Sequence, residues 1–121
     1  MIAIADVLVV LVAILHAWFL VLEMFLWTRP IGLRTFRNSE ERARDSRTLA
    51  ANQGLYNGFL AAGLVWGLVT SPAEHAFAVK TFFLGCVVTA GLFGALTVSR
   101  KIFFVQAVPA ILALGFLFLG R

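Results

Sequence analysis

Cysteine and charge are both scarce in this chain. One cysteine, Cys86, stands among 121 residues, so an intramolecular disulfide framework is excluded. Only 13% of the residues are charged, whereas 61% are hydrophobic and the mean hydropathy is +0.95. A soluble domain of this size needs a mostly polar surface, which so few charges cannot supply. The composition therefore predicts an integral membrane protein, with Cys86 as a small packing residue.

Several familiar kinds of site are missing as well. The two histidines, His16 and His75, should lie in and beyond opposite halves of a membrane, so we expect no metal site. The chain has no Ser, His, Asp arrangement and no phosphate-binding loop, and no helix carries the spaced charges of a selective pore. The net charge of +4 comes from residues beside predicted helix ends, so we expect no nucleic-acid partner.

Four apolar stretches fill the chain, and each is long enough to cross a bilayer. They predict an all-α fold, a single integral membrane domain over residues 1–121, with helices at about 2–27, 39–69, 76–98 and 102–119. The first stretch should remain in the mature protein, because it lacks an early basic cluster and an Ala-x-Ala cleavage site. Short connections make this a four-transmembrane-helix antiparallel bundle.

Basic residues predict the orientation. The first connection and the start of the second helix hold six arginines and the third connection holds Arg100 and Lys101, whereas the second connection carries Glu74 and no Lys or Arg. The positive-inside rule therefore places the N and C termini outside and the first and third connections in the cytoplasm. Asn38, followed by Glu41, resembles a capping box that starts the second helix, and Pro109 should kink the fourth.

The second helix has two functional faces side by side. One is a stripe of small residues suited to close helix packing: Ala50, Gly54, Gly58 and Ala62. The other is an arc of three amides and a phenol: Asn52, Gln53, Tyr56 and Asn57. Lipid should touch only the remaining sector around Leu55, Phe59 and Trp66. The other three helices can hardly cover both the small-residue stripe and the polar arc. We therefore expect a homo-oligomer with this helix near its centre.

Polar groups of three helices share one depth in the cytoplasmic leaflet. A ligand pocket there would use seven residues: Glu23, Asn52, Gln53, Tyr56, Asn57, Arg100 and Gln106. Glu23 needs a cation or a proton at that depth, and the loop arginines or Arg100 could pair with it. His16, seven residues earlier on the same helix face, could handle protons with Glu23. Alternatively, the amides bind no ligand and only form hydrogen bonds between helices.

Several segments resemble a bacterial family of small membrane proteins, grouped as domain of unknown function 1304. They are His16, residues 22–27 (LEMFLW), residues 52–59 (NQGLYNGF), residues 83–85 (FLG), Gln106 and residues 109–110 (PA). This resemblance covers nearly the whole chain. It implies a four-helix, multi-pass protein of the bacterial inner membrane, without an established activity.

A more distant resemblance is to the MAPEG superfamily, the membrane-associated proteins of eicosanoid and glutathione metabolism. Residues 34–40 (RTFRNSE) are similar to its basic, Phe, Asn, acidic run, and Arg44 and Arg47 precede Asn52 as its arginine pair does. The resemblance implies a homotrimer with cytoplasm-facing glutathione sites. The chain departs from the pattern at Leu55, Cys86 and Phe93, where the superfamily has Glu, Arg and Tyr.

These features lead to one functional hypothesis and two rivals. The leading hypothesis is a MAPEG-like homo-oligomer, with a trimer favoured, that binds an amphiphilic small molecule or a thiol such as glutathione in its inner-leaflet pocket. Enzymatic activity of the glutathione-transferase kind is left open, because the superfamily's key residues are not matched. The rivals are a non-catalytic accessory membrane protein and a small proton-coupled exporter that uses His16 and Glu23.

Overall fold

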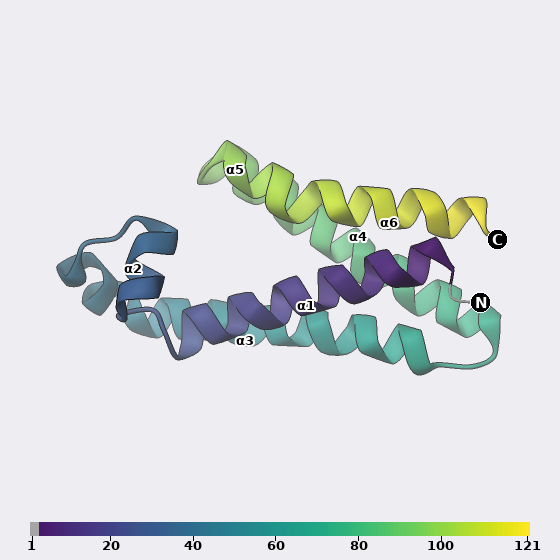
Figure 1. Cartoon of the computed structure of the whole chain (residues 1–121), viewed down its shortest axis with the longest axis horizontal. Helices are drawn as coiled ribbons and strands as arrows, with labels where there is room; N and C mark the ends of the chain where they lie inside the picture. The colour runs from purple at the N-terminus through teal and green to yellow at the C-terminus, as the bar shows by residue number, and fades with distance from the viewer. Residues whose placement is uncertain (1–2) are drawn as a thin grey trace. The chain divides into compact units, whose positions relative to one another are not determined.

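The regular elements of the computed structural model, which describes residues 3–121, are all helical (Figure 1). In chain order they are α1 (Ile4–Met24), α2 (Pro30–Phe36), α3 (Glu40–Val69), α4 (Ala73–Thr97), α5 (Arg100–Ile102), the π-helical segment η1 (Phe103–Ala107) and α6 (Val108–Leu119). The all-α class is confirmed. Three of the long predicted helices correspond to α1, α3 and α4, and the last to the run from α5 to α6, whereas α2 was not predicted.

The chain divides into two compact units, which we describe separately. One, the 14–59 unit, holds the second half of α1, the short α2 and the first part of α3. The other, the second unit, comprises residues 3–13 and 60–121. Both α1 and α3 contribute residues to each unit.

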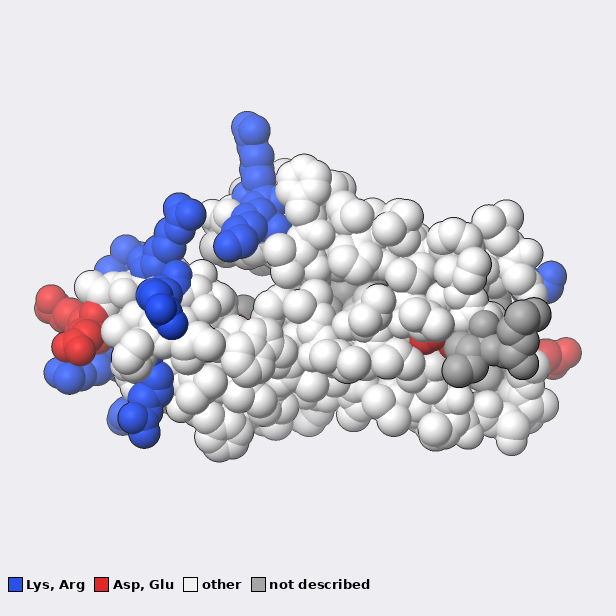
Figure 2. Space-filling view, in the orientation of Figure 1, with Lys and Arg blue, Asp and Glu red and all other residues white. Residues whose placement is uncertain are grey.

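Within residues 3–121, three helices are long and apolar enough to cross a membrane: Ile4–Met24, Ala73–Thr97 and Arg100–Leu119. Helix α3 falls short of this measure, because its first turns are charged and three amides follow. Within the 14–59 unit, arginine side chains gather over α2 and the first turns of α3, and the rest of the visible face is largely uncharged (Figure 2). On this face, the exposed charge of the unit lies at its α2 end.

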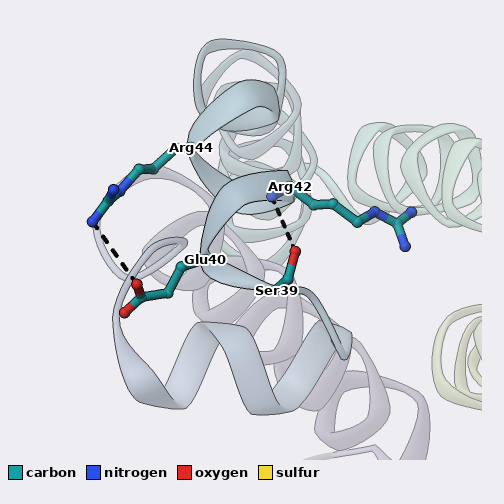
Figure 3. Close-up of polar contacts among 4 residues, drawn as sticks. All are labelled: Ser39, Glu40, Arg42 and Arg44. Carbon is teal, nitrogen blue, oxygen red and sulfur yellow. Dashed lines mark hydrogen bonds and ion pairs between the residues drawn. The ribbon is translucent and has the colours of Figure 1, made fainter.

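The start of α3 differs from the prediction by one residue. Ser39, not Asn38, caps the helix, because its Oγ accepts a hydrogen bond of 3.2 Å from the backbone N–H of Arg42 (Figure 3). The backbone N–H of Asn38 instead donates to the carbonyl of Leu33, at the end of α2. Glu40 and Arg44, one turn apart, form an exposed ion pair of 3.9 Å.

Helix α2 is held against α3 by a tryptophan in the segment between α1 and α2. The Trp27 indole donates a hydrogen bond of 3.1 Å to Ser46 Oγ, and its ring lies 4.8 Å from that of Phe36. Gly32 is buried in α2 against the backbone carbonyl of Leu26, so no side chain would fit there. The predicted loop is therefore a folded element rather than a loose connection.

Two glycines bring α1 and α3 together in the 14–59 unit. A Cβ at Gly54 would lie 2.8 Å from Met24 Cγ, and one at Gly58 would lie 2.6 Å from Leu20 Cδ1. One turn forward along α3 therefore corresponds to one turn back along α1. The two helices run antiparallel and in close contact over this stretch.

The second unit has an apolar core drawn from four helices. Its members are small or branched side chains: Ala5, Val9, Val12, Ala13, Leu64, Leu84, Val87, Ala110, Ala113 and Leu117. Gly63 and Gly67 of α3 lie against Phe83 and Lys80 of α4. Close packing of α3 on α4 thus depends on glycine, as its packing on α1 does.

The irregularity expected at Pro109 takes the form of a π-helical turn just before it. The backbone N–H of Val108 donates to the carbonyl of Phe103, five residues earlier, and Pro109 then sits in the first turn of α6. A widened turn accommodates the proline ring, which would otherwise clash with the preceding turn. This turn places Ala107 against Gly91 of α4, whose absent Cβ would lie 2.8 Å from Ala107 N.

Candidate functional site

A buried pair of polar side chains joins α1 to α3 in the 14–59 unit. Asn57 Nδ2 donates a hydrogen bond of 2.5 Å to Glu23 Oε1, and the two residues are only 8% and 5% exposed. Gly54, one turn before Asn57 on the same side of α3, lets α1 approach closely enough for this bond. Two residues predicted to share a site therefore meet directly.

The other members of the polar arc of α3 point out of the unit. Asn52, Gln53 and Tyr56 are all exposed, Tyr56 to 55%. The Tyr56 ring lies 6.0 Å from that of Phe59, which is also exposed. Their hydrogen-bonding groups are therefore free to contact a ligand or another protein surface.

Glu23 has an amide partner, whereas the sequence predicted a cation or a proton. Ion pairs in the part of the chain that the structure describes join Arg44 to Glu40 and Lys80 to Asp6. The expected pairing of Glu23 with a loop arginine is therefore not found within the 14–59 unit, because Asn57 takes up the carboxylate oxygen. Arg100 is exposed on α5 and Gln106 is half-buried in η1, both in the second unit.

His16 is fully buried on α1 in the 14–59 unit. Its ring makes an edge-to-face contact with Phe19 at 5.4 Å between centroids. Because Glu23 is buried on the same helix and in the same unit, both predicted proton-handling groups are withdrawn from the surface. A metal site is a separate matter: residues 3–121 contain no group of three or more His, Cys, Asp or Glu placed to hold an ion.

The small-residue stripe follows the prediction over only part of α3. Ala50 and Gly54 are buried and Gly58 is half-buried, whereas Ala62 is exposed. Beyond Gly58 the close contacts pass to Gly63 and Gly67, one residue later than the four-residue spacing from Gly58 predicts. The signal was present in the sequence, because Gly63 and Gly67 themselves repeat at four.

Lys80 is the polar residue that sequence reasoning missed. Its Nζ lies 2.8 Å from Asp6 Oδ1 in the second unit, and the two side chains are 11% and 36% exposed. A lysine within an apolar span needs a partner, so its presence in the stretch 76–98 could have prompted a search for one. The pair joins α4 to the start of α1, next to Gly67 of α3.

A cavity of about 250 Å³ opens beside the first turns of α3. Thr28, which follows α1, lines it together with Glu40, Arg44 and Arg47 of α3. None of the residues expected to line a pocket belongs to it. The cavity instead lies at the charged end of the 14–59 unit, where the arginines gather (Figure 2).

Comparison with known proteins relates this chain to one family. Residues 10–118 match the family described as "Protein of unknown function (DUF1304)". The uncharacterized protein YpaA of Lactococcus lactis subsp. lactis (strain IL1403) is 34% identical over 110 residues, which are 89% of this chain and 91% of the relative. No solved structure matches the chain. On these matches, the chain belongs to the DUF1304 family.

Proposed function

We propose that this protein crosses the bacterial inner membrane four times, with both termini outside, and that α3 is the fourth span. Its antiparallel contact with α1, from Gly54 against Met24 to Gly58 against Leu20, supports this assignment. A helix that follows an apolar spanning helix residue by residue shares its depth in the bilayer. The arginines at one end of the 14–59 unit then lie on the cytoplasmic side.

At that depth, α3 carries polar groups that the chain itself does not cover. Asn52, Gln53 and Tyr56 are exposed, although hydrocarbon offers no hydrogen bonds. Each unsatisfied group costs about 1–3 kcal/mol. This observation carries the proposal that a second copy covers the polar arc, in a homo-oligomer. The resemblance to the MAPEG superfamily favours a trimer.

The same arc would form the polar part of a ligand pocket in the inner leaflet. Asn57 and Glu23, fixed by their buried hydrogen bond, form its rigid back. Asn52, Gln53 and Tyr56 would orient a polar head, with Arg100 and Gln106 as further candidates. The apolar helix faces would hold a hydrophobic tail, so the ligand is an amphiphilic small molecule, with glutathione or another thiol as one candidate.

A second candidate function is a non-catalytic accessory protein in which the amides only lock helices together. The observation that favours it is the Asn57–Glu23 bond itself, because an amide already occupied by a neighbouring helix has less capacity for a ligand. The two candidates differ at Gln53, which is exposed on α3 and is not part of the bond between Asn57 and Glu23.

A thermal-shift screen tests the proposal. The purified protein is heated with glutathione, fatty-acid derivatives and quinones, and the ligand-dependent rise in the unfolding midpoint is recorded. For Gln53→Leu we expect an intact assembly that has lost this rise, whereas Phe59→Leu, on the apolar sector, retains it. If no compound raises the midpoint, or if Gln53→Leu merely dissociates the assembly, the accessory function is favoured instead.

A further inference from the structure

The cavity at the start of α3 combines charges of both signs with a hydroxyl. Arg44 and Arg47 contribute two guanidinium groups, Glu40 a carboxylate and Thr28 a hydroxyl. The Glu40–Arg44 pair is 3.9 Å long, and both side chains are 73% exposed, so solvent screens it and it opens at little cost. The charged groups are therefore available to a bound molecule.

The depth of the cavity corresponds to the phospholipid headgroup layer, a step that rests on the proposed crossing of α3. Arg47 is the last charged residue before the apolar part of α3. At 1.5 Å per residue, Arg44 lies roughly 4.5 Å further from the hydrocarbon and Glu40 roughly 10 Å further. The interfacial layer on each side of a bilayer is about 5–7 Å thick. The two arginines thus lie within this layer, and Glu40 at its aqueous edge.

Among the residues that line the cavity, the order of charges along α3 matches the order of charges along a zwitterionic headgroup. In a phosphatidylethanolamine, the phosphate lies next to the glycerol and the ammonium extends toward water. Guanidinium groups bind phosphate oxygens in a planar fork, and a carboxylate accepts hydrogen bonds from an ammonium. A volume of about 250 Å³ holds roughly eight waters. A phosphoethanolamine group is of similar size.

We propose that the cavity lined by Thr28, Glu40, Arg44 and Arg47 is a binding site for a phosphoethanolamine lipid headgroup of the cytoplasmic leaflet. The phosphate binds Arg44 and Arg47, the ammonium binds Glu40, and the Thr28 hydroxyl donates to a phosphate oxygen. An anionic headgroup without an ammonium offers Glu40 no cation and places a second negative charge beside its carboxylate. The site therefore prefers a phosphoethanolamine lipid to phosphatidylglycerol.

Lipid retention measures this preference directly. The full-length protein is placed in nanodiscs of equal parts phosphatidylethanolamine and phosphatidylglycerol, released, and analysed by native mass spectrometry for the lipids that stay bound. We expect phosphatidylethanolamine to be enriched. Arg44→Gln and Arg47→Gln should each reduce its retention about tenfold, the effect of one lost charge-assisted hydrogen bond. Glu40→Gln should shift the preference toward phosphatidylglycerol.

Arg42→Gln is the matched control, because Arg42 lies on the same turn of α3 but extends away from Arg44 and does not line the cavity (Figure 3). It should retain wild-type selectivity. Equal retention of both lipids by the wild type, or an equal loss in Arg42→Gln and Arg47→Gln, would overturn the proposal. Stabilisation by free phosphoethanolamine equal to that by the lipid would overturn the lipid assignment.

Two outcomes separate this proposal from the proposed function. A wild-type protein that does not insert into nanodiscs contradicts the membrane crossing on which the depth argument depends. A protein that inserts and assembles but retains both lipids equally overturns only the headgroup site. Helical content measured by circular dichroism confirms that each variant is folded before its lipids are compared.

Discussion

At the residue scale, polar side chains in the apolar helices pair across helices. Asn57 of α3 binds Glu23 of α1 in one unit, and Lys80 of α4 binds Asp6 of α1 in the other. Each pair places a group that hydrocarbon cannot solvate against a complementary group from a different helix. These bonds fix which helix faces meet, in a chain where apolar faces alone are nearly interchangeable.

Removing Asn57 should leave a buried carboxyl group without its partner. We expect Asn57→Leu to lower the free energy of unfolding by about 1–3 kcal/mol, measured by SDS titration in mixed micelles. The double variant Asn57→Leu, Glu23→Met should recover part of that loss, because both polar groups are then gone. An unchanged stability of Asn57→Leu would show that the Glu23 carboxyl does not depend on this bond.

The Asp6–Lys80 pair should respond asymmetrically to the loss of either partner. Lys80 is 11% exposed and Asp6 is 36% exposed, so an unpaired lysine is left in the less polar surroundings. Asp6→Ala should therefore cost more than Lys80→Met, with an upper value of about 3 kcal/mol. The same titration measures both, and the double variant should be more stable than Asp6→Ala alone. Equal costs would contradict the burial argument.

At the element scale, glycines decide which helices approach closely. Gly54 and Gly58 receive α1, Gly63 and Gly67 receive α4, and Gly91 of α4 receives the π-helical turn. Gly63 faces the rigid ring of Phe83 and Gly91 faces the backbone of Ala107, so an added methyl group has least room at these two positions, whereas Gly54 and Gly58 face the more flexible side chains of Met24 and Leu20. Helix order is thereby coupled to single small residues rather than to total hydrophobicity.

Gly91 and Gly85 form a matched pair on α4. A Cβ at Gly91 would lie 2.8 Å from the backbone nitrogen of Ala107, whereas one at Gly85 meets nothing within 4 Å. Gly91→Ala should lower the free energy of unfolding by about 1–3 kcal/mol through overpacking. Gly85→Ala should leave it unchanged or raise it by up to about 1 kcal/mol, since alanine favours the helix. The unfolding midpoints of the two variants are compared in the same detergent. Equal midpoints would refute the steric explanation.

The sequence predicts the long helices well and their contacts poorly, for physical reasons. Hydropathy and length report burial in a bilayer, which explains why α1, α4 and the α5–α6 run could be located. They do not report which neighbour covers a polar group. Lys80 was missed for that reason, and the sequence offered Glu23 a cation or a proton but not the amide of Asn57 that reaches it from α3.

The sequence pattern also did not predict the local backbone geometry at the start of α3 or before Pro109. Ser39 and Asn38 are both good helix caps, and choosing between them depends on where α2 ends, which the sequence did not show. The π-helical turn depends likewise on the contact of Ala107 with Gly91. A proline pattern predicts an irregularity near Pro109 but not its form.

At the scale of the whole molecule, the polar arc of α3 links the fold to the proposed assembly. Asn57 faces inward and is satisfied by Glu23, whereas Asn52, Gln53 and Tyr56 face outward. The exposed amides and phenol lie at the same depth as the buried amide of Asn57, where hydrocarbon would leave them without hydrogen bonds. A second copy of the chain and a ligand could supply those bonds. The DUF1304 match over residues 10–118 includes this whole arc.

Native mass spectrometry of the protein released from nanodiscs tests that central claim most directly, because one spectrum reports both the number of copies and any bound small molecule. The account predicts an oligomer, with a trimer favoured, that carries an added amphiphile mass, and a Gln53→Leu variant that keeps the copy number and loses the added mass. A wild-type protein that is monomeric and carries no added mass would contradict it.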